Sequence, residues 1–476
     1  MKLIYDVKDK PKFGQLIVFA IQQLLAIMAA TLVVPVIVGN GMSSAAALFG
    51  AGCGTLVYLA FTKMKSPVFL GSSFAFLGSM AAAFAGAISI QLGYLGLILG
   101  TIFAGLVYVI IAIIVKFAGV NWINKLMPAV VIGPTVSIIG LSLATNAIGD
   151  LLSGGNKVPE ISYVAQLSDA GVWELVEQTN FVPTASPYIA LLCGLVTILT
   201  VCVSSVYGKK IGKLIPFIIG IGAGYAVATV FTLIGLKTNN PELIVINFAP
   251  LTDLFVNGIT IKTFLSVPEF TFLTAVKGIN DISATYVISI LVAYVPVAFV
   301  VFAEHIADHK NISSIIEKDL LVEPGLSRTL LGDGVGSMVG AFFGGCPNTT
   351  YGESVGCVAI TKNASVYTIL TAAILAILIS FISPFVALVN TIPACVMGGV
   401  CMALYGFIAV SGLKMIQKVN LEDNKNLFVV SVILIAGIGG LTLSFGKVTI
   451  TSIACALILG IIVNIIVNLK KTNTAE

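Results

Sequence analysis

Apolar runs long enough to cross a lipid bilayer recur along nearly the whole of this 476-residue chain. A spanning α-helix needs about 20 apolar residues in succession. Hydrophobic residues make up 58% of the chain and charged residues only 10%, whereas about 25% of an average soluble domain is charged. This balance excludes a soluble enzyme, a secreted disulfide scaffold and a disordered protein. We therefore predict an all-α polytopic membrane protein.

Charged and Pro/Gly-rich breaks divide the chain into fourteen predicted spans. They are 14–38, 43–62, 66–86, 90–117, 124–148, 187–207, 211–236, 282–308, 326–345, 348–361, 365–388, 393–413, 426–445 and 448–469. The first run is too long for the core of a signal peptide, so it is taken as a span. The two longest polar segments, 149–186 and 237–281, are not expected to be folded domains.

The distribution of Lys and Arg predicts the orientation. With the N-terminus in the cytoplasm and sides alternating, 20 of the 25 Lys and Arg residues fall on the inner side, as the positive-inside rule requires. The five on the outer side are Lys157, Lys237, Lys262, Lys277 and Lys447. We expect a multi-pass protein of the cell membrane, with both termini in the cytoplasm and both long loops outside.

Two predicted spans, the third and the tenth, are interrupted by small and polar residues. The third contains Leu70–Phe76 (LGSSFAF) and the tenth contains Cys346–Glu353 (CPNTTYGE). These positions are equivalent if the chain is two inverted repeats of seven spans. Such paired interruptions indicate a transporter's binding site, because free backbone groups at mid-membrane need a ligand, water or protein partner. Close helix packing through small residues is the alternative interpretation.

Four carboxylates lie inside predicted spans, namely Glu304, Asp308, Asp333 and Glu353. A carboxylate in the membrane is costly unless it is paired, hydrated or protonated, so it is a functional-site hypothesis by default. Glu304 and Asp308 are four residues apart and share one helical face. Asp333 lies close to Arg328, which favours a helix-end or salt-bridge role for it.

The chemistry of these acids predicts the kind of ligand. No Lys or Arg is predicted in the spans near them, so the acids suit a ligand with N–H donors or a cation, and an anion is disfavoured. Carboxylates also take up and release protons, which offers a means of coupling. His305 and His309, the two histidines of the chain, are expected to serve at a helix end or in packing. The sequence has no Walker A motif and no CxxC pair, and we predict no cofactor and no metal.

The motifs resemble those of the nucleobase–ascorbate transporter family, also called the nucleobase:cation symporter-2 family, and within it the bacterial uracil permease branch. The resemblance rests on Ala26–Pro35, Gly71–Phe76, Ala303–His305, Lys318–Leu321, Pro324–Leu326, Pro347–Glu353, Val396–Val400 and Leu404–Gly406. It implies a 7+7 inverted repeat with short strands in spans three and ten. A core domain would comprise 14–117 and 282–388, and a gate domain 124–236 and 393–469.

The resemblance also implies a function and a site. The protein would be a secondary active transporter that imports a nucleobase, most favourably uracil, by proton symport, and would not be an enzyme. Glu304 and Glu353 would accept the ring N–H groups. Phe74 and Gly352 would offer backbone N–H groups, and Tyr405 would close over the base. The position of Asp308, one turn cytoplasmic of Glu304 on the same helical face, predicts separately that it passes the coupling proton to or from Glu304. A structural role, as a helix cap or through a hydrogen bond to the first span, is the alternative.

Other readings stay open from the sequence. A xanthine or urate permease would share the fold and both acids, and an anion carrier of 7+7 architecture is a more distant alternative. No nucleic-acid partner is expected, and a homodimer is left open. Three positions depart from the family pattern: Gln23 stands where the family usually has His, Asp308 where the uracil branch commonly has His, and Ser354 where the family usually has Asn.

Overall fold

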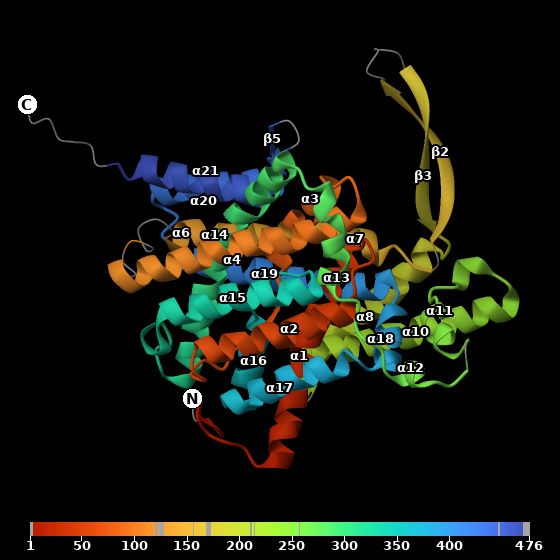
Figure 1. Cartoon of the computed structure of the whole chain (residues 1–476), viewed down its shortest axis with the longest axis horizontal. Helices are drawn as coiled ribbons and strands as arrows, with labels where there is room; N and C mark the ends of the chain where they lie inside the picture. Colours follow the sequence, from red (N-terminus) through yellow and green to blue (C-terminus); the bar gives the residue numbers. More distant parts are fainter. Residues whose placement is uncertain are drawn as a thin grey trace, which may run out of the picture.

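The computed structural model describes residues 3–119, 122, 128–155, 157–167, 173–209, 212–213, 215–256, 258–445 and 448–469. Within these ranges the protein is mostly helical, with three sheets of two strands each (Figure 1). The first residues of the predicted fifth span, 124–127, lie outside the described residues. So do six lysines used in the charge count: Lys2, Lys125, Lys210, Lys447, Lys470 and Lys471.

Eight stretches of described helix are long and apolar enough to cross a membrane. They are α1 (Phe13–Val38), α2 (Ser44–Phe61), α4 (Ile90–Ala118), α6 (Ala129–Ser142) continued by α7 (Ala144–Leu151), α8 (Pro187–Tyr207), α10 (Pro216–Thr238), α14 (Ala284–Ile316) and α19 (Ala394–Ile416). Shorter apolar helices include η1 (Phe74–Phe76) with α3 (Leu77–Ala85), α17 (Val366–Ile379), α20 (Asn424–Ile438) and α21 (Ser452–Val467). The prediction of a multi-pass helical membrane protein is confirmed.

Small residues bring the central helices close together. Helix α15 (Leu326–Gly344) packs against α2 and α4. A Cβ atom at Gly50 of α2 would lie 2.4 Å from the backbone oxygen of Gly340 in α15. Only glycine permits this approach, and small residues at helix contacts are typical of membrane proteins, where van der Waals packing drives association.

The helices pack in two sets. In one, α15 packs on α2 and α4, α14 on α4, and α17 on α1 and α2; in the other, α19 packs on α6, α7 and α8, α10 on α8, and α20 on α6 and α21. The sets meet where α14 packs against α6 and α21, and where α1 packs against α10 and α19.

The first long polar segment is more ordered than its polarity predicts. Strands β2 (Lys157–Leu167) and β3 (Trp173–Pro183) form an antiparallel hairpin that projects from the helical body (Figure 1). The segment 149–186 was expected not to be a folded domain, and this two-stranded hairpin adds regular structure to it without making it one. β-Branched and aromatic residues recur in both strands and favour extended structure, although the overall polarity of the segment conceals this.

The remaining elements are short. Between α10 and α14 lie η2 (Pro241–Leu243), α11 (Ala249–Thr252), η3 (Asp253–Phe255), α12 (Ile261–Phe264), α13 (Thr271–Ala275) and η4 (Val276–Asp281); elsewhere are η5 (Leu321–Gly325), α18 (Ser383–Asn390), β5 (Leu443–Phe445) and β6 (Val448–Ile450). Several predicted boundaries differ. The predicted span 426–445 ends in β5, and the predicted span 448–469 begins with β6. Helix α14 continues to Ile316 instead of ending at 308, and the predicted span 365–388 is divided between α17 and α18.

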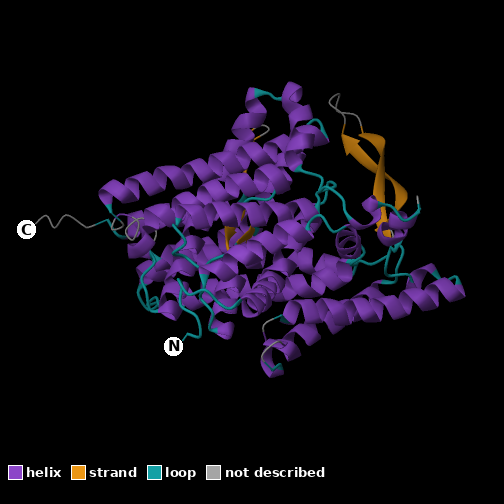
Figure 2. Cartoon of the chain, turned by 60° about the horizontal axis from the view of Figure 1, so that its bottom comes forward, coloured by secondary structure: helices purple, strands orange, loops and turns teal. Residues whose placement is uncertain are grey.

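Both interrupted segments contain a strand. Strand β1 (Leu70–Ser72) pairs antiparallel with β4 (Asn348–Thr350), with Gly71 opposite Thr349. All six residues are buried, and Figure 2 shows this short sheet surrounded by helices. Strand β1 leads into η1 and α3, and β4 leads into α16 (Gly352–Thr361). Each strand therefore satisfies the backbone groups of the other in the middle of the protein.

Candidate functional site

Tyr351 fastens the two strands together. Its hydroxyl donates to the Ser72 carbonyl at 2.7 Å, and its backbone N–H donates to the Phe69 carbonyl at 3.3 Å. The Ser73 N–H donates to the Pro347 carbonyl at 2.9 Å. Backbone groups beyond the strand register are thus also paired, which makes the sheet a fixed platform between the helices.

Gly71 is predicted to be essential to this platform. A Cβ atom at residue 71 would lie 2.3 Å from Cε2 of the Tyr351 ring, and that ring is held by its bond to Ser72. Overpacking a buried contact costs about 1–3 kcal/mol, so Gly71→Ala should lower the free energy of unfolding by that amount. Gly222→Ala, where a Cβ atom meets nothing within 4 Å, is the matched control. Thermal unfolding that is equal in the two variants would contradict the close contact.

Two of the positions that depart from the family pattern contact each other. The Gln23 Nε2 donates to the Ser354 hydroxyl oxygen, which also accepts the Phe69 N–H at 3.1 Å. Gln23 belongs to α1, Phe69 immediately precedes β1, and Ser354 lies in the first turn of α16. The Ser354 hydroxyl therefore links three elements around the strand pair, and the two departures form one interaction.

A cavity of about 350 Å³ lies between the two helix sets. Four of the residues predicted for the site line it: Glu304 and Asp308 from α14, and Gly352 and Glu353 from the start of α16. The facing wall comes from other helices and includes Val136 of α6, Ser205 of α8, Phe217 of α10, and Phe407, Ile408 and Ser411 of α19. The structure thus brings three carboxylates to one hollow.

The remaining two predicted residues lie together but do not line this cavity. Phe74 is 7% exposed and Tyr405 is 2% exposed. Their rings meet edge to face, with centroids 5.6 Å apart and an interplanar angle of 81°. Phe74 follows β1, and Tyr405 belongs to α19, so this aromatic pair joins the strand platform to the opposite helix set.

A basic residue also lines the cavity, contrary to the sequence-based expectation. Lys213 lies among the lining residues, just before α10 begins at Pro216. The expectation considered only charges inside predicted spans near the acids in sequence. Lys213 is almost a hundred residues from Glu304, and only the tertiary fold brings the two to one cavity.

Asp308 contacts the strand platform. Its Oδ2 accepts a hydrogen bond from the Thr350 hydroxyl at 2.8 Å, and Thr350 pairs with Leu70 across the sheet. The structural alternative foresaw a bond to the first span. The partner that the structure provides comes from β4.

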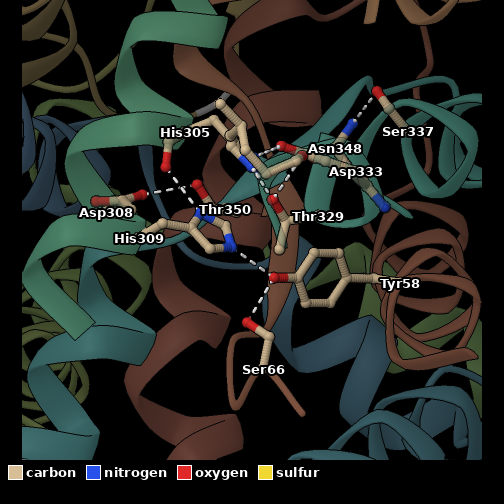
Figure 3. Close-up of polar contacts among 11 residues, drawn as sticks. Tyr58, Ser66, His305, Asp308, His309, Thr329, Asp333, Ser337, Asn348 and Thr350 are labelled. Carbon is tan, nitrogen blue, oxygen red and sulfur yellow. Dashed lines mark hydrogen bonds and ion pairs between the residues drawn. The ribbon is translucent and has the colours of Figure 1, made fainter. Parts of the chain in front are cut away.

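The histidines of α14 face away from its acids and are fully buried. His305 Nδ1 lies 2.6 Å from Asp333 Oδ2, and its Nε2 lies 3.0 Å from the Thr329 hydroxyl (Figure 3). The Asp333 prediction is therefore corrected: its partner is His305 of a neighbouring helix instead of nearby Arg328. The Thr329 hydroxyl also lies 3.0 Å from the Leu326 carbonyl, so both ring nitrogens of His305 are held by polar partners from α15.

His309 extends this network to α2. Its Nδ1 donates to the His305 carbonyl at 2.8 Å, and its Nε2 lies 2.7 Å from the Tyr58 hydroxyl, which lies 2.6 Å from Ser66 Oγ. The two imidazole rings stack with centroids 4.0 Å apart. The helix-end role expected for the histidines is wrong, since α14 continues to Ile316. One face of α14 thus carries the acids, and another is hydrogen-bonded through its histidines to α2 and α15.

Among the described residues, no group of three or more His, Cys, Asp or Glu side chains is arranged to hold a metal ion. The eight cysteines are free. The polar chemistry of the cavity is that of carboxylates, hydroxyls, a lysine and backbone groups.

Comparison with known proteins identifies the family. The model described as Permease family matches residues 14–445. The chain belongs to this family, the nucleobase–ascorbate transporters. Among curated relatives, the uracil permease of Bacillus subtilis (strain 168) is 34% identical over 479 residues, which cover 100% of this chain and 98% of the relative. The uracil permease of Bacillus caldolyticus is 35% identical, with 98% and 95% covered. That of Escherichia coli (strain K12) is 32% identical, with 97% and 94% covered.

Solved structures of similar fold are more distant in sequence. The transmembrane domain of the cyanobacterial bicarbonate transporter BicA aligns with a TM-score of 0.61 at 14% identity, covering 97% of this chain and 100% of that one. The murine Solute Carrier 26 family member A9 anion transporter, in its inward-facing state, aligns with a TM-score of 0.59 at 12% identity, covering 97% and 69%. At these identities the likeness concerns the fold alone.

Proposed function

We propose that this permease imports uracil by proton symport, and that the cavity bearing Glu304, Asp308 and Glu353 is its substrate site. The main support is that Glu304 and Asp308 of α14 and Glu353 of α16 line one cavity together with Gly352. Full-length relatives named uracil permease support the choice of substrate.

The chemistry of the cavity suits a neutral planar base. Uracil presents two N–H donors and two carbonyl acceptors around one ring. Glu304 and Glu353 would accept the N–H groups, and hydrogen bonds to an ionised acceptor are stronger than neutral ones. The backbone N–H of Gly352, which lines the cavity, would meet one carbonyl. The Phe74 N–H would meet the other once the base reaches beyond the cavity wall to the Phe74–Tyr405 pair. Tyr405, stacked edge to face on Phe74, would close the end of the site.

The architecture that we propose for transport has fourteen spans in a 7+7 inverted repeat. Residues 14–117 and 282–388 would form the core domain, and 124–236 and 393–469 the gate domain. The packing of the helices in two sets and the antiparallel pairing of β1 with β4 support this division. We further propose a cell-membrane location, with both termini in the cytoplasm.

Proton coupling is assigned to Asp308 together with Glu304. The two acids lie one helical turn apart and both line the cavity. The bond from Thr350 to Asp308 links the acid to the strand that carries the substrate segment. A change in the protonation of Asp308 would therefore alter its hydrogen bond with Thr350 of β4. Such a link between the proton site and the substrate site is what coupling of proton and uracil binding requires.

Two other classes of substrate, purines and anions, are alternatives to uracil. Xanthine or urate would use the same acids. An anion is favoured by one observation, Lys213 on the cavity wall, but three carboxylates on the same cavity oppose it. Homodimer formation is left to measurement.

Equilibrium binding to the purified protein separates these candidates. We expect labelled uracil to bind saturably and to be displaced by excess unlabelled uracil, with weaker displacement by xanthine or urate and none by bicarbonate. Binding that follows xanthine would reassign the substrate to a purine. Failure of a large excess of uracil to affect the transport of any nucleobase would reject the proposal.

A further inference from the structure

A small chamber lies between α4, α14, α15 and β4. It is lined by Tyr108 of α4, Asp333 and Ser337 of α15, and Asn348 and Thr349 of β4. Its volume is about 10 Å³. A single water molecule needs a chamber of about 10–15 Å³ with two to four polar partners. The dimensions therefore match one water and exclude a larger ligand.

Two residues that line the chamber each carry a buried oxygen atom with no hydrogen-bond partner among the described residues. These are Asp333 Oδ1 and Tyr108 Oη, on side chains that are 1% and 4% exposed. Buried polar groups in folded proteins are nearly always hydrogen-bonded, to protein or to ordered water. Two such atoms on one small chamber point to a ligand that serves both.

The chemistry of the wall selects the ligand. A carboxylate oxygen without a proton only accepts, whereas a phenol hydroxyl can donate, and water can donate to the first and accept from the second. Ser337 Oγ already accepts the Asn348 N–H at 2.9 Å, which leaves its own hydrogen for a further acceptor. A bare cation such as Ca²⁺ takes about six to eight oxygen ligands, whereas Asp333 supplies the one charged side chain among the residues that line this chamber.

We propose that the chamber binds one water molecule, which donates to Asp333 Oδ1 and accepts from Tyr108 Oη. Asp333 then holds His305 with one oxygen and the water with the other. Through Ser337 and the Asn348 N–H, the same cluster supports β4 from behind (Figure 3). Asp333 and Tyr108 are thereby positioning residues for the strand whose Thr350 contacts Asp308. This positioning role rests on the proposed function, but the water site does not.

The first test is an experimental map at a resolution that shows ordered waters. We expect a peak about 2.6–3.2 Å from both Asp333 Oδ1 and Tyr108 Oη, present in sodium-containing and in sodium-free choline buffer. An empty chamber would overturn the proposal. A peak that appears only with sodium and lies within bonding distance of several oxygens would replace the water with a cation.

The second test uses two tyrosines of the same helix. Tyr108→Phe removes the hydroxyl that faces the chamber and should weaken uracil binding by about threefold to tenfold, the effect of losing one hydrogen bond. Tyr94→Phe removes a hydroxyl that donates to the Asn40 carbonyl at 3.1 Å, and it should leave uracil affinity unchanged. Equal affinities in both variants would overturn the positioning role.

The outcomes separate this inference from the proposed function. Absence of uracil binding by the unmodified protein, with water in the chamber, would reject uracil as substrate and leave the water site intact. Should Tyr108→Phe fail to fold, the two maps of the unmodified protein still decide the water site. Ser337→Ala, which lacks the Ser337 hydroxyl, then decides the positioning role: uracil affinity should fall by at least about threefold.

Discussion

Replacing Glu304 by Gln should reduce uracil affinity by about 10- to 150-fold, which corresponds to the loss of one buried charge-assisted hydrogen bond worth about 1.5–3 kcal/mol. The substitution keeps the size of the side chain but turns one acceptor oxygen into an NH₂ donor. That donor would face the ring N–H of the base. Equilibrium binding of labelled uracil to the purified variant measures the effect.

A surface acid supplies the matched control for this variant. Glu323 lies on a segment outside the cavity, with its side chain 71% exposed, and its Oε1 lies 2.5 Å from Lys65 Nζ. The hydrogen bond from Lys65 lowers the pKa of the Glu323 carboxyl. Glu323→Gln should bind uracil as the unmodified protein does. Unchanged affinity in Glu304→Gln would remove Glu304 from the site.

Asp308→Asn should abolish accumulation driven by a proton gradient while uracil still binds and exchanges. An asparagine can still accept the Thr350 hydrogen bond through its amide oxygen, so β4 keeps that contact. It cannot take up and release a proton at neutral pH, so the uphill step loses its driving ion. Asp253→Asn, at an exposed carboxylate of η3 outside the cavity, should accumulate uracil normally.

The two functions of Asp308 give different results in this experiment. Uracil accumulation that is unimpaired in the Asn variant would leave the residue with a structural role through Thr350. Loss of both exchange and binding would mean that the site itself has collapsed, which a thermal unfolding curve would reveal.

Where chemistry and periodicity coincide, the sequence singles out residues that the fold brings together. Glu304 and Asp308 fall on one helical face by their spacing, and both line the cavity. The interrupted segments at Gly71 and Asn348 contain strands that pair with each other. An unpaired carboxylate or backbone group costs free energy inside a membrane. This cost marks such residues in the sequence as candidates for a site.

The sequence could not predict contacts that only the tertiary fold creates. His305 and Asp333 lie on different helices, and a linear reading offered Arg328 as the nearer partner for the acid. Lys213 reaches the cavity from a connection between helices. One available signal was overlooked: His305 and His309 repeat the four-residue spacing of the acids one position later in the same helix, which predicts a second polar face.

The hairpin of β2 and β3 was missed for a different reason. Its residues are polar overall, whereas the predicted elements were defined by apolar runs. A separate scan of 157–183 for β-branched and aromatic residues would have predicted strands there, because a two-stranded ribbon outside the membrane does not need a continuous apolar run.

Uptake into proteoliposomes with an imposed pH gradient decides whether uracil transport is driven by protons. Purified protein is reconstituted, and labelled uracil is supplied outside with the interior more alkaline, with and without sodium. We expect uracil to accumulate above the equilibrium level when the proton gradient is directed inward, with or without sodium. Accumulation should disappear when the gradient is collapsed, and it should be lost in the Glu304→Gln variant. Uptake that follows sodium and ignores the pH gradient, or no uracil uptake at all, would contradict proton-driven uracil transport.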